Sequence, residues 1–285
     1  MRTSVLTIAA VFFGMTSTAA LADSGGDQWA LHGFGDTSVK NDYITPRGLV
    51  VTTDGVTVQS LNGLVLVSPY GFAIDAGTWV DVNPGYNKKD NITSLNEFDY
   101  FVGISGNIAK GLKAGIEYSE FISGQPSVAF QNEHNLEFSL KYSDKGWSGF
   151  TLNPYAKLFY AFSSKSSTVV TGKAGGTFDV ELGAVPTYSF GVVTASVPTW
   201  ITVGPKDYWA GPGFKKDGNL GTFQTGLKLS TPVPLAKGAG LTVYGQVQYY
   251  HAINDNLVIA ETLLNPDHPF KRDRVVFGVG LGYGF

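Results

Sequence analysis

The chain contains no cysteine, and charged residues make up only 15% of its 285 residues. Without cysteine it forms no disulfide bonds and no cysteine-ligated metal site, and thiol chemistry is excluded. The formal net charge of -3 is close to neutral, which argues against a nucleic-acid partner. Such a low charge content is unusual for a soluble β-protein, but it is expected of a barrel whose outer face is solvated by lipid.

The chain also lacks a long apolar run: after the first 22 residues, no stretch approaches the ~20 apolar residues that a transmembrane helix requires. The beginning resembles a secretory signal, with Arg2, an apolar stretch from Val5 to Met15, and the small-x-small sequence Ala20-Leu21-Ala22. We therefore predict a cleaved signal peptide over residues 1–22 and one domain over residues 23–285. If the mature chain resides in a membrane, it must form a closed barrel, because only helices and closed barrels satisfy every backbone N–H and C=O in hydrocarbon.

The dominant hydrophobic period after the signal is two residues, which is typical of β-strands. At the C-terminus, apolar residues occupy every second position, and the positions between them are mostly glycine. The apolar set is Val275, Phe277, Val279, Leu281, Tyr283 and Phe285, and the other set is Arg274, Val276, Gly278, Gly280, Gly282 and Gly284. The alternation recurs within residues 72–82, 112–119, 136–143, 150–163, 178–183, 223–230 and 241–249. We interpret the apolar set of each segment as facing lipid and the other set as facing a polar lumen.

The connections between these segments alternate in length. Long connections are expected at 253–272, 204–218, 163–176, 121–134 and 83–95, and shorter breaks at 232–239, near Pro186, and at 144–148, 109–111 and 68–70. Outer-membrane barrels have long extracellular loops and short periplasmic turns. The sequence therefore predicts an all-β fold, a transmembrane antiparallel up-and-down β-barrel of about 12 strands. Roughly 10 or 14 strands stay open as alternatives, because residues 27–67 and 188–203 do not alternate cleanly.

Short motifs in the N-terminal half are shared with a known family. They are Asp42-Tyr43 with Arg47-Gly48, Gly71-Phe72 before Trp79, Glu97-Phe98-Asp99 with Gly103, Glu117-Tyr118, and Asn135-Leu136-Glu137. Over residues 40–145 the sequence resembles the TorF-type family of porins. The resemblance implies a small bacterial outer-membrane barrel and a porin-like activity, but it names no solute.

The last residues also resemble a known signal. Gly280-x-x-Tyr283-x-Phe285 is similar to the C-terminal sequence that the barrel assembly machinery of the outer membrane reads, with Gly278 where many barrels carry a polar residue. We therefore expect the barrel assembly machinery and outer-membrane lipids among the partners. Aromatic residues are candidates for girdles at the two membrane interfaces, although Trp79 has inward parity: Trp29, Tyr43, Trp79, Tyr100, Tyr160, Trp200 and Tyr283.

No catalytic or metal-binding motif stands out in the sequence. The four histidines, His32, His134, His251 and His268, have no metal-ligand spacing, and two of them fall in predicted loops. Outer-membrane phospholipases are similar in strand number, but their His-x-Ser-x-Gly type of strand segment has no counterpart here. We predict a protein that is not an enzyme and has no cofactor.

Charged residues are expected on the inner face of the barrel. The acids are Asp75, Asp81, Asp99, Glu117, Glu137, Asp179 and Glu181, and the bases are Lys113, Lys141, Lys157, Lys228 and Arg274. Such groups set the selectivity of a water-filled pore, together with its diameter. They can also pair with one another and fill the barrel, since a barrel of about 12 strands lies between filled 8-strand barrels and open 16-strand porins.

These observations favour a passive outer-membrane channel for small solutes, with at most a weak preference for cations. The alternatives are a non-conducting structural or adhesive barrel and, less favoured, a barrel hydrolase.

Overall fold

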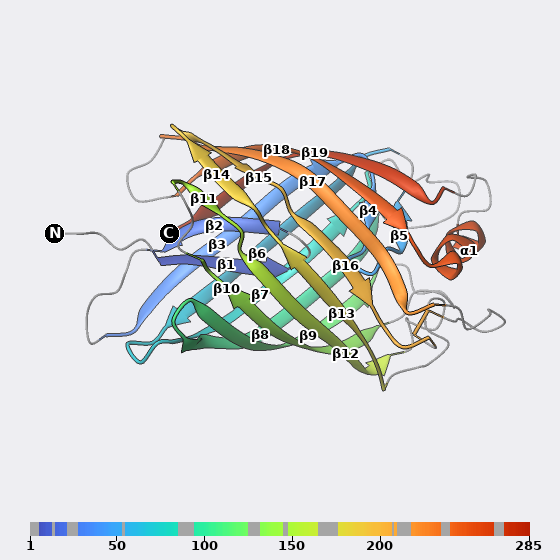
Figure 1. Ribbon diagram of the computed structural model, residues 1–285, viewed down its shortest axis with the longest axis horizontal. Helices are drawn as coiled ribbons and strands as arrows, with labels where there is room; N and C mark the ends of the chain where they lie inside the picture. The colour runs from blue at the N-terminus through green and yellow to red at the C-terminus, as the bar shows by residue number, and fades with distance from the viewer. Residues whose placement is uncertain are drawn as a thin grey trace.

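The computed structural model describes residues 6–12, 15–21, 28–52, 55–84, 94–124, 132–144, 148–164, 176–206, 208–209, 218–234, 240–264 and 271–285. These residues form β-strands almost throughout, with one helix, α1 (Asp255–Leu264). The strands wrap into a closed antiparallel barrel (Figure 1). Within the described ranges, no helix is both long and apolar enough to cross a bilayer.

Twelve strands close the barrel, as the sequence predicts. Nine are continuous: β3 (Ala30–Lys40), β6 (Thr57–Val67), β7 (Phe72–Val82), β8 (Leu95–Ala109), β9 (Leu112–Ser123), β10 (Glu133–Tyr142), β17 (Leu220–Pro232), β18 (Thr242–Ala252) and β19 (Asp273–Gly284). Three are divided: β11 (Phe150–Thr151) with β12 (Pro154–Ser164), β13 (Thr177–Ala184) with β14 (Thr187–Phe190), and β15 (Val193–Ser196) with β16 (Thr199–Val203). Each strand pairs with the next along the chain, and β19 pairs with β3 to close the ring.

The divided strands break at prolines. Pro154, Pro186 and Pro198 each lie at or beside a break, and proline has no N–H to donate to the ladder. The expected turn near Pro186 is therefore wrong, because the strand resumes as β14 beyond it. The turn falls instead at Gly191, whose φ of 61° is a conformation that glycine adopts without strain.

The connections segregate by length, as predicted. Short turns such as 110–111 and 191–192 lie at one end, the turn end, together with the C-terminus (Figure 1). The intervals between strands are longer at the other end, the loop end, where the described residues 41–52 and helix α1 lie. In outer-membrane barrels the long loops are extracellular and the short turns periplasmic.

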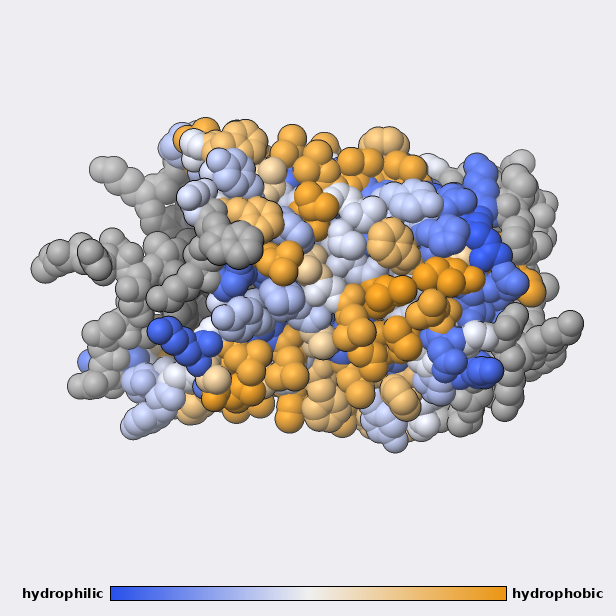
Figure 2. Space-filling view, viewed as in Figure 1, coloured by the Kyte–Doolittle hydropathy of each residue, from blue (hydrophilic) through white to orange (hydrophobic). Residues whose placement is uncertain are grey.

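Apolar side chains of the predicted outward parity cover the outside of the barrel. On β19, Phe277 and Val279 are 60% and 62% exposed, whereas the intervening parity holds Val276, which is 2% exposed. Figure 2 shows an apolar band across the middle of the barrel, with polar residues gathered at the loop end. An exposed apolar surface of this extent is unusual in soluble monomers and matches the lipid-facing band of membrane barrels.

The residues assigned to the signal peptide form a separate hairpin. Strands β1 (Leu6–Phe12) and β2 (Met15–Leu21) pair with each other and do not join the barrel sheet. The barrel itself begins at β3, beyond the expected cleavage site. Cleavage of residues 1–22 stays a prediction.

Candidate functional site in the barrel lumen

Residues 41–52, between β3 and β6, fold into the barrel and form what we call the inserted segment. Its strands β4 (Tyr43–Ile44) and β5 (Val50–Thr52) pair with each other and not with the barrel wall. A turn between them is closed by the N–H of Gly48, which donates to the carbonyl oxygen of Thr45 over 2.8 Å. Pro46 occupies the second position of this turn, where its fixed φ favours the reversal. The segment therefore enters the lumen as a compact hairpin.

Arg47 at the tip of the hairpin anchors it to the far wall. Its guanidinium donates a hydrogen bond to Glu133 and another to Oδ1 of Asn135 over 3.2 Å, both on β10. Its Nε lies 3.5 Å from Oδ1 of Asp179 on β13. Burial disfavours the charged guanidinium, but the neighbouring carboxylates outweigh it and raise the pKa of Arg47 above its ordinary value. One permanent cation thus joins the inserted segment to two barrel strands.

Other contacts seat the remainder of the hairpin. The hydroxyl of Tyr43 donates to Oε2 of Glu97 on β8 over 2.6 Å, and its ring lies 5.3 Å from that of Trp79 on β7. At the tip, Gly48 has a φ of 86°, and a Cβ there would lie 1.8 Å from Oγ1 of Thr222 on β17. Position 48 therefore requires glycine, both for its backbone conformation and for its close approach to the wall.

Acidic side chains surround the inserted segment toward the loop end: Asp81, Glu97, Asp99, Glu133 and Asp179. Asp81 accepts hydrogen bonds from Thr57 over 2.5 Å and from Asn96 over 2.6 Å. The described cations that act on this group are Arg47 and Lys40. Acids therefore outnumber bases at the level where the segment narrows the lumen.

A ladder of charged residues lies on the inner face of β7–β13, nearer the turn end. In the pairing of β9 with β10, Glu117 lies opposite Glu137, and Lys113 lies opposite Lys141. Lys157 of β12 places its Nζ 3.7 Å from Oε2 of Glu137. The direct pairs on β9 and β10 therefore carry like charges, whereas Lys157 lies directly opposite Glu181 on β13 and close to Glu137 on β10.

The sequence-predicted lumen residues fall into three groups. Asp75, Lys113, Glu117, Glu137, Lys141, Lys157 and Glu181 form the ladder, and Asp99 and Asp179 lie near the inserted segment. Lys228 lies on the opposite wall, 3.6 Å above the ring of Tyr244, whose hydroxyl donates to Asp36 over 2.6 Å. Arg274 lies on β19 and interacts with Asp42.

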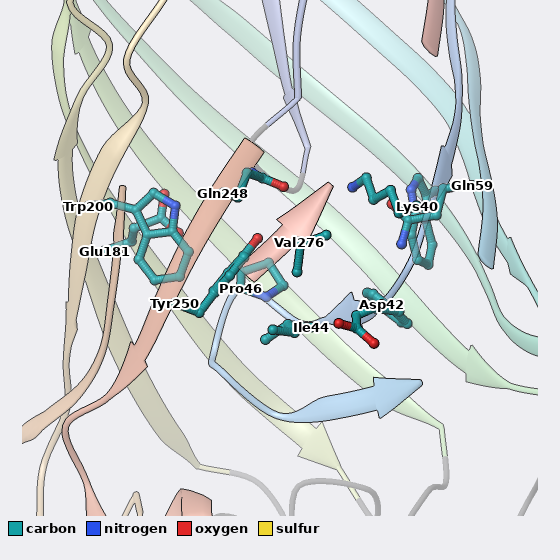
Figure 3. Close-up of a pocket in the computed structure, with 12 residues that line it drawn as sticks. Lys40, Asp42, Ile44, Pro46, Gln59, Glu181, Trp200, Gln248, Tyr250 and Val276 are labelled. Carbon is teal, nitrogen blue, oxygen red and sulfur yellow. The ribbon is translucent and has the colours of Figure 1, made fainter. Parts of the chain in front are cut away.

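A pocket lies between the inserted segment and the wall, and Figure 3 shows residues that line it, among them Lys40, Asp42, Gln59, Trp200, Gln248 and Tyr250. Its volume is about 470 Å³, including the part open to solvent. Tyr43, Ile44 and Pro46 of the inserted segment line one side of it, so the position of the hairpin sets the size of this space.

The sequence did not reveal the inserted segment, and this changes the assignment of two aromatic residues. Tyr43 and Trp200 are 2% and 5% exposed, so their expected place in an interfacial girdle is wrong. They fill the lumen together with Trp79, whose inward parity had indicated this position. Trp29, Tyr100 and Tyr160 are exposed on the outer surface, and Tyr283 is partly exposed there.

The C-terminal residues of the expected assembly signal lie at the closing seam of the barrel. Tyr283 pairs with Gly35, and Phe285 exchanges two backbone hydrogen bonds with Gly33, of 2.9 and 3.0 Å. Gly280 lies opposite Ser38 in the same pairing. Their recognition by the assembly machinery stays a prediction.

Two histidines make local contacts on the barrel, and His134 lies on β10 and not in a loop as expected. Nδ1 of His251 lies 2.7 Å from Oδ1 of Asp273, which also accepts a 2.5 Å hydrogen bond from the hydroxyl of Tyr249. Nδ1 of His134 lies 2.9 Å from the hydroxyl of Tyr118. His268 lies outside the described residues. Both described contacts join a histidine to a tyrosine or a carboxylate, and neither includes a serine nucleophile.

Comparison with solved structures supports the same fold. An outer membrane channel from Pseudomonas putida F1 has a TM-score of 0.51 at 8% sequence identity, over 89% of this chain and 95% of that one. At this identity the similarity shows the fold alone. A porin (12% identity, 90% and 100% covered, TM-score 0.35) and the outer membrane phospholipase A of Escherichia coli (12%, 88% and 91%, 0.44) are more distant in structure. No family model and no curated protein sequence matches the chain, so the resemblance to the TorF-type family stays a prediction.

Proposed function

We propose that this protein is an outer-membrane channel for the passive diffusion of small solutes, narrowed by the inserted segment. The observation that supports it is the character of the lumen, where the wall carries many charged and amide side chains and a short hairpin that is not part of the wall lies against them. The hairpin is tied to the wall by side-chain contacts, polar and apolar, and by no strand pairing, so it can move without breaking the barrel sheet. The solutes, the membrane lipids and the assembly machinery are the partners that this function requires.

The charges near the inserted segment support a preference for cations. Acids outnumber bases at this level, and charged side chains at the narrowest part of a pore act on a permeating ion at short range. The preference is expected to be modest, because Arg47 places one positive charge in the same space.

We further propose that residues 1–22 direct export and are then removed, and that the C-terminal strand is read during assembly. Both agree with a barrel whose first strand, β3, starts and whose last strand, β19, ends at the turn end.

Planar-bilayer recording of the refolded protein tests the channel function. Discrete ion-conducting steps are expected, from protein that shows the heat-dependent gel mobility of a folded barrel. A folded preparation that never conducts would refute the channel.

The second candidate is a structural barrel with a permanently closed lumen. The burial of the inserted segment favours this candidate, because Tyr43, Ile44 and Val50 pack into apolar clusters with the wall. The conductance of a variant whose hairpin is released from the wall separates the two candidates. If this variant also fails to conduct, the structural barrel is the correct assignment.

A further inference from the structure

One wall of the lumen combines aromatic rings with an unsatisfied amide. On β16, β17 and β18, Trp200, Gln224 and Tyr250 lie directly opposite one another on the inner face. The rings of Trp200 and Tyr250 meet edge to face, with centroids 6.1 Å apart. Gln224 is fully buried, and neither its amide oxygen nor its amide nitrogen has a hydrogen-bond partner among the described residues. A buried amide without hydrogen-bond partners in a native structure needs an explanation, and one explanation is that it binds a ligand.

The same wall continues into the pocket beside the inserted segment. Gln248, two residues before Tyr250 on β18, lines the pocket, and Gln59 lines it from β6. In Figure 3, Trp200 and Gln59 stand on opposite sides of this space, and the side chain of Gln248 extends into it. Aromatic rings and primary amides thus face a common space from both sides.

The charged residues of the pocket do not call for a charged solute. Each has an oppositely charged neighbour within the lumen: Lys40 with Asp81, Asp42 with Arg274, and Glu181 with Lys157. A permeating cation or anion would therefore compete with a charge that is already present. Gln248 accepts one hydrogen bond, of 3.4 Å from Gln246, and Gln59 bonds Asp81, so each amide has further donor or acceptor positions to offer a solute beside the aromatic rings.

We infer that this wall binds uncharged polyhydroxylated solutes, with the chemistry of sugars. Each hydroxyl is a donor and an acceptor, and a glutamine amide offers both functions without charge. The C–H faces of a sugar ring pack against aromatic rings, whose apolar bodies supply most of the contact area in small-molecule sites. The inference rests on the proposed channel function, because Ile44 and Pro46 of the inserted segment close the pocket and must shift before a sugar can enter.

Calorimetric titration of the refolded protein in detergent with glucose tests the inference, with lysine and glutamate as charged probes. Saturable binding of glucose and not of either amino acid is expected. Gln248→Glu, which exchanges the amide for a carboxylate, and Trp200→Ala should each weaken glucose binding by about three- to tenfold, the loss of roughly one hydrogen bond or ring contact. Trp29→Ala is the matched control, because Trp29 is exposed on the outer surface and should leave binding unchanged.

Arg47→Ala keeps the test decisive if the closed hairpin hides the site, since this variant releases the tip of the inserted segment and should bind glucose more tightly than the native chain. Absence of saturable glucose binding in both proteins would overturn the inference, as would tighter binding of lysine or glutamate. Conductance measured on the same preparations separates the two proposals. Glucose binding without conductance supports the site and refutes the channel, whereas conductance without glucose binding supports the channel and refutes the site.

Discussion

The inserted segment narrows the lumen of the barrel. A single substitution, Arg47→Ala, should release its tip from the wall. The guanidinium that is lost contacts Glu133 and Asp179, whose side chains are 3% and 1% exposed. It also lies over the rings of Phe121 and Phe159, at 5.5 and 5.8 Å. Without it, the seated hairpin would leave two buried carboxylates with no cation between them.

The magnitude follows from the burial of this site. Removing one partner of a fully buried ion pair costs about 3–5 kcal/mol. The Arg47 side chain is 17% exposed, and water enters once the hairpin moves, so we expect about 2–3 kcal/mol against the seated state. Since about 1.4 kcal/mol corresponds to a tenfold change in an equilibrium, the ratio of released to seated hairpin should rise about 30- to 150-fold. Single-channel conductance and open probability should both increase in planar bilayers.

The control is the removal of a comparable arginine at the loop end. Arg272→Ala removes a cation whose ion pair with Asp255 is exposed to solvent, and this substitution should leave the conductance unchanged. An unaltered conductance in Arg47→Ala, matching that of Arg272→Ala, would refute the role of the hairpin as the constriction.

Three further predictions concern the lumen and the seam. Glu97→Gln with Asp99→Asn should lower the preference for cations, measured as a reversal potential across a KCl gradient, and an unchanged potential would place these acids outside the ion path. Trp79→Ala should lower the free energy of unfolding by about 3–5 kcal/mol in urea titrations of the refolded barrel, because it empties the centre of a buried cluster, whereas Trp29→Ala should change it little. Gly35→Val should destabilise the closing seam by about 1–3 kcal/mol, because a Cβ at position 35 would lie 2.3 Å from Cζ of Tyr283. The fraction of protein with the gel mobility of a folded barrel should fall. Full folding of this variant would show that the seam tolerates the side chain.

The barrel wall could be predicted from the sequence because each strand faces two solvents. Phe277 and Val276 are both apolar, yet parity alone assigns the first to lipid and the second to the interior, as the structure has it. The sequence predicts a turn near Pro186, but the structure has it at Gly191, because Pro186 interrupts the hydrogen-bond ladder without reversing the strand. A proline signals the loss of one hydrogen bond, and the sequence does not say whether the chain turns there.

The contents of the lumen could not be predicted in the same way. The inserted segment has no alternating pattern, because its residues face the wall through specific pairs such as Tyr43 with Glu97 and Arg47 with Glu133. These partners lie far apart along the chain, and no local rule connects them. The sequence offered one local signal, Pro46-Arg47-Gly48, which is typical of a turn but does not indicate that the turn points inward.

The arrangement of charges on β9 and β10 distinguishes a hydrated path from a filled core. Glu117 lies directly opposite Glu137, and Lys113 directly opposite Lys141, although like charges in cross-strand pairs are destabilising. A barrel that needed only to be filled would gain stability from opposite or apolar pairs at these positions. Gly115 and Ser139 separate the two like-charge pairs, and Lys157, 3.7 Å from Glu137 and directly opposite Glu181, offsets part of their repulsion. The ladder therefore places charged groups of both signs on one wall of the lumen, as the proposed channel requires, and in that proposal the inserted segment, not this wall, is the constriction.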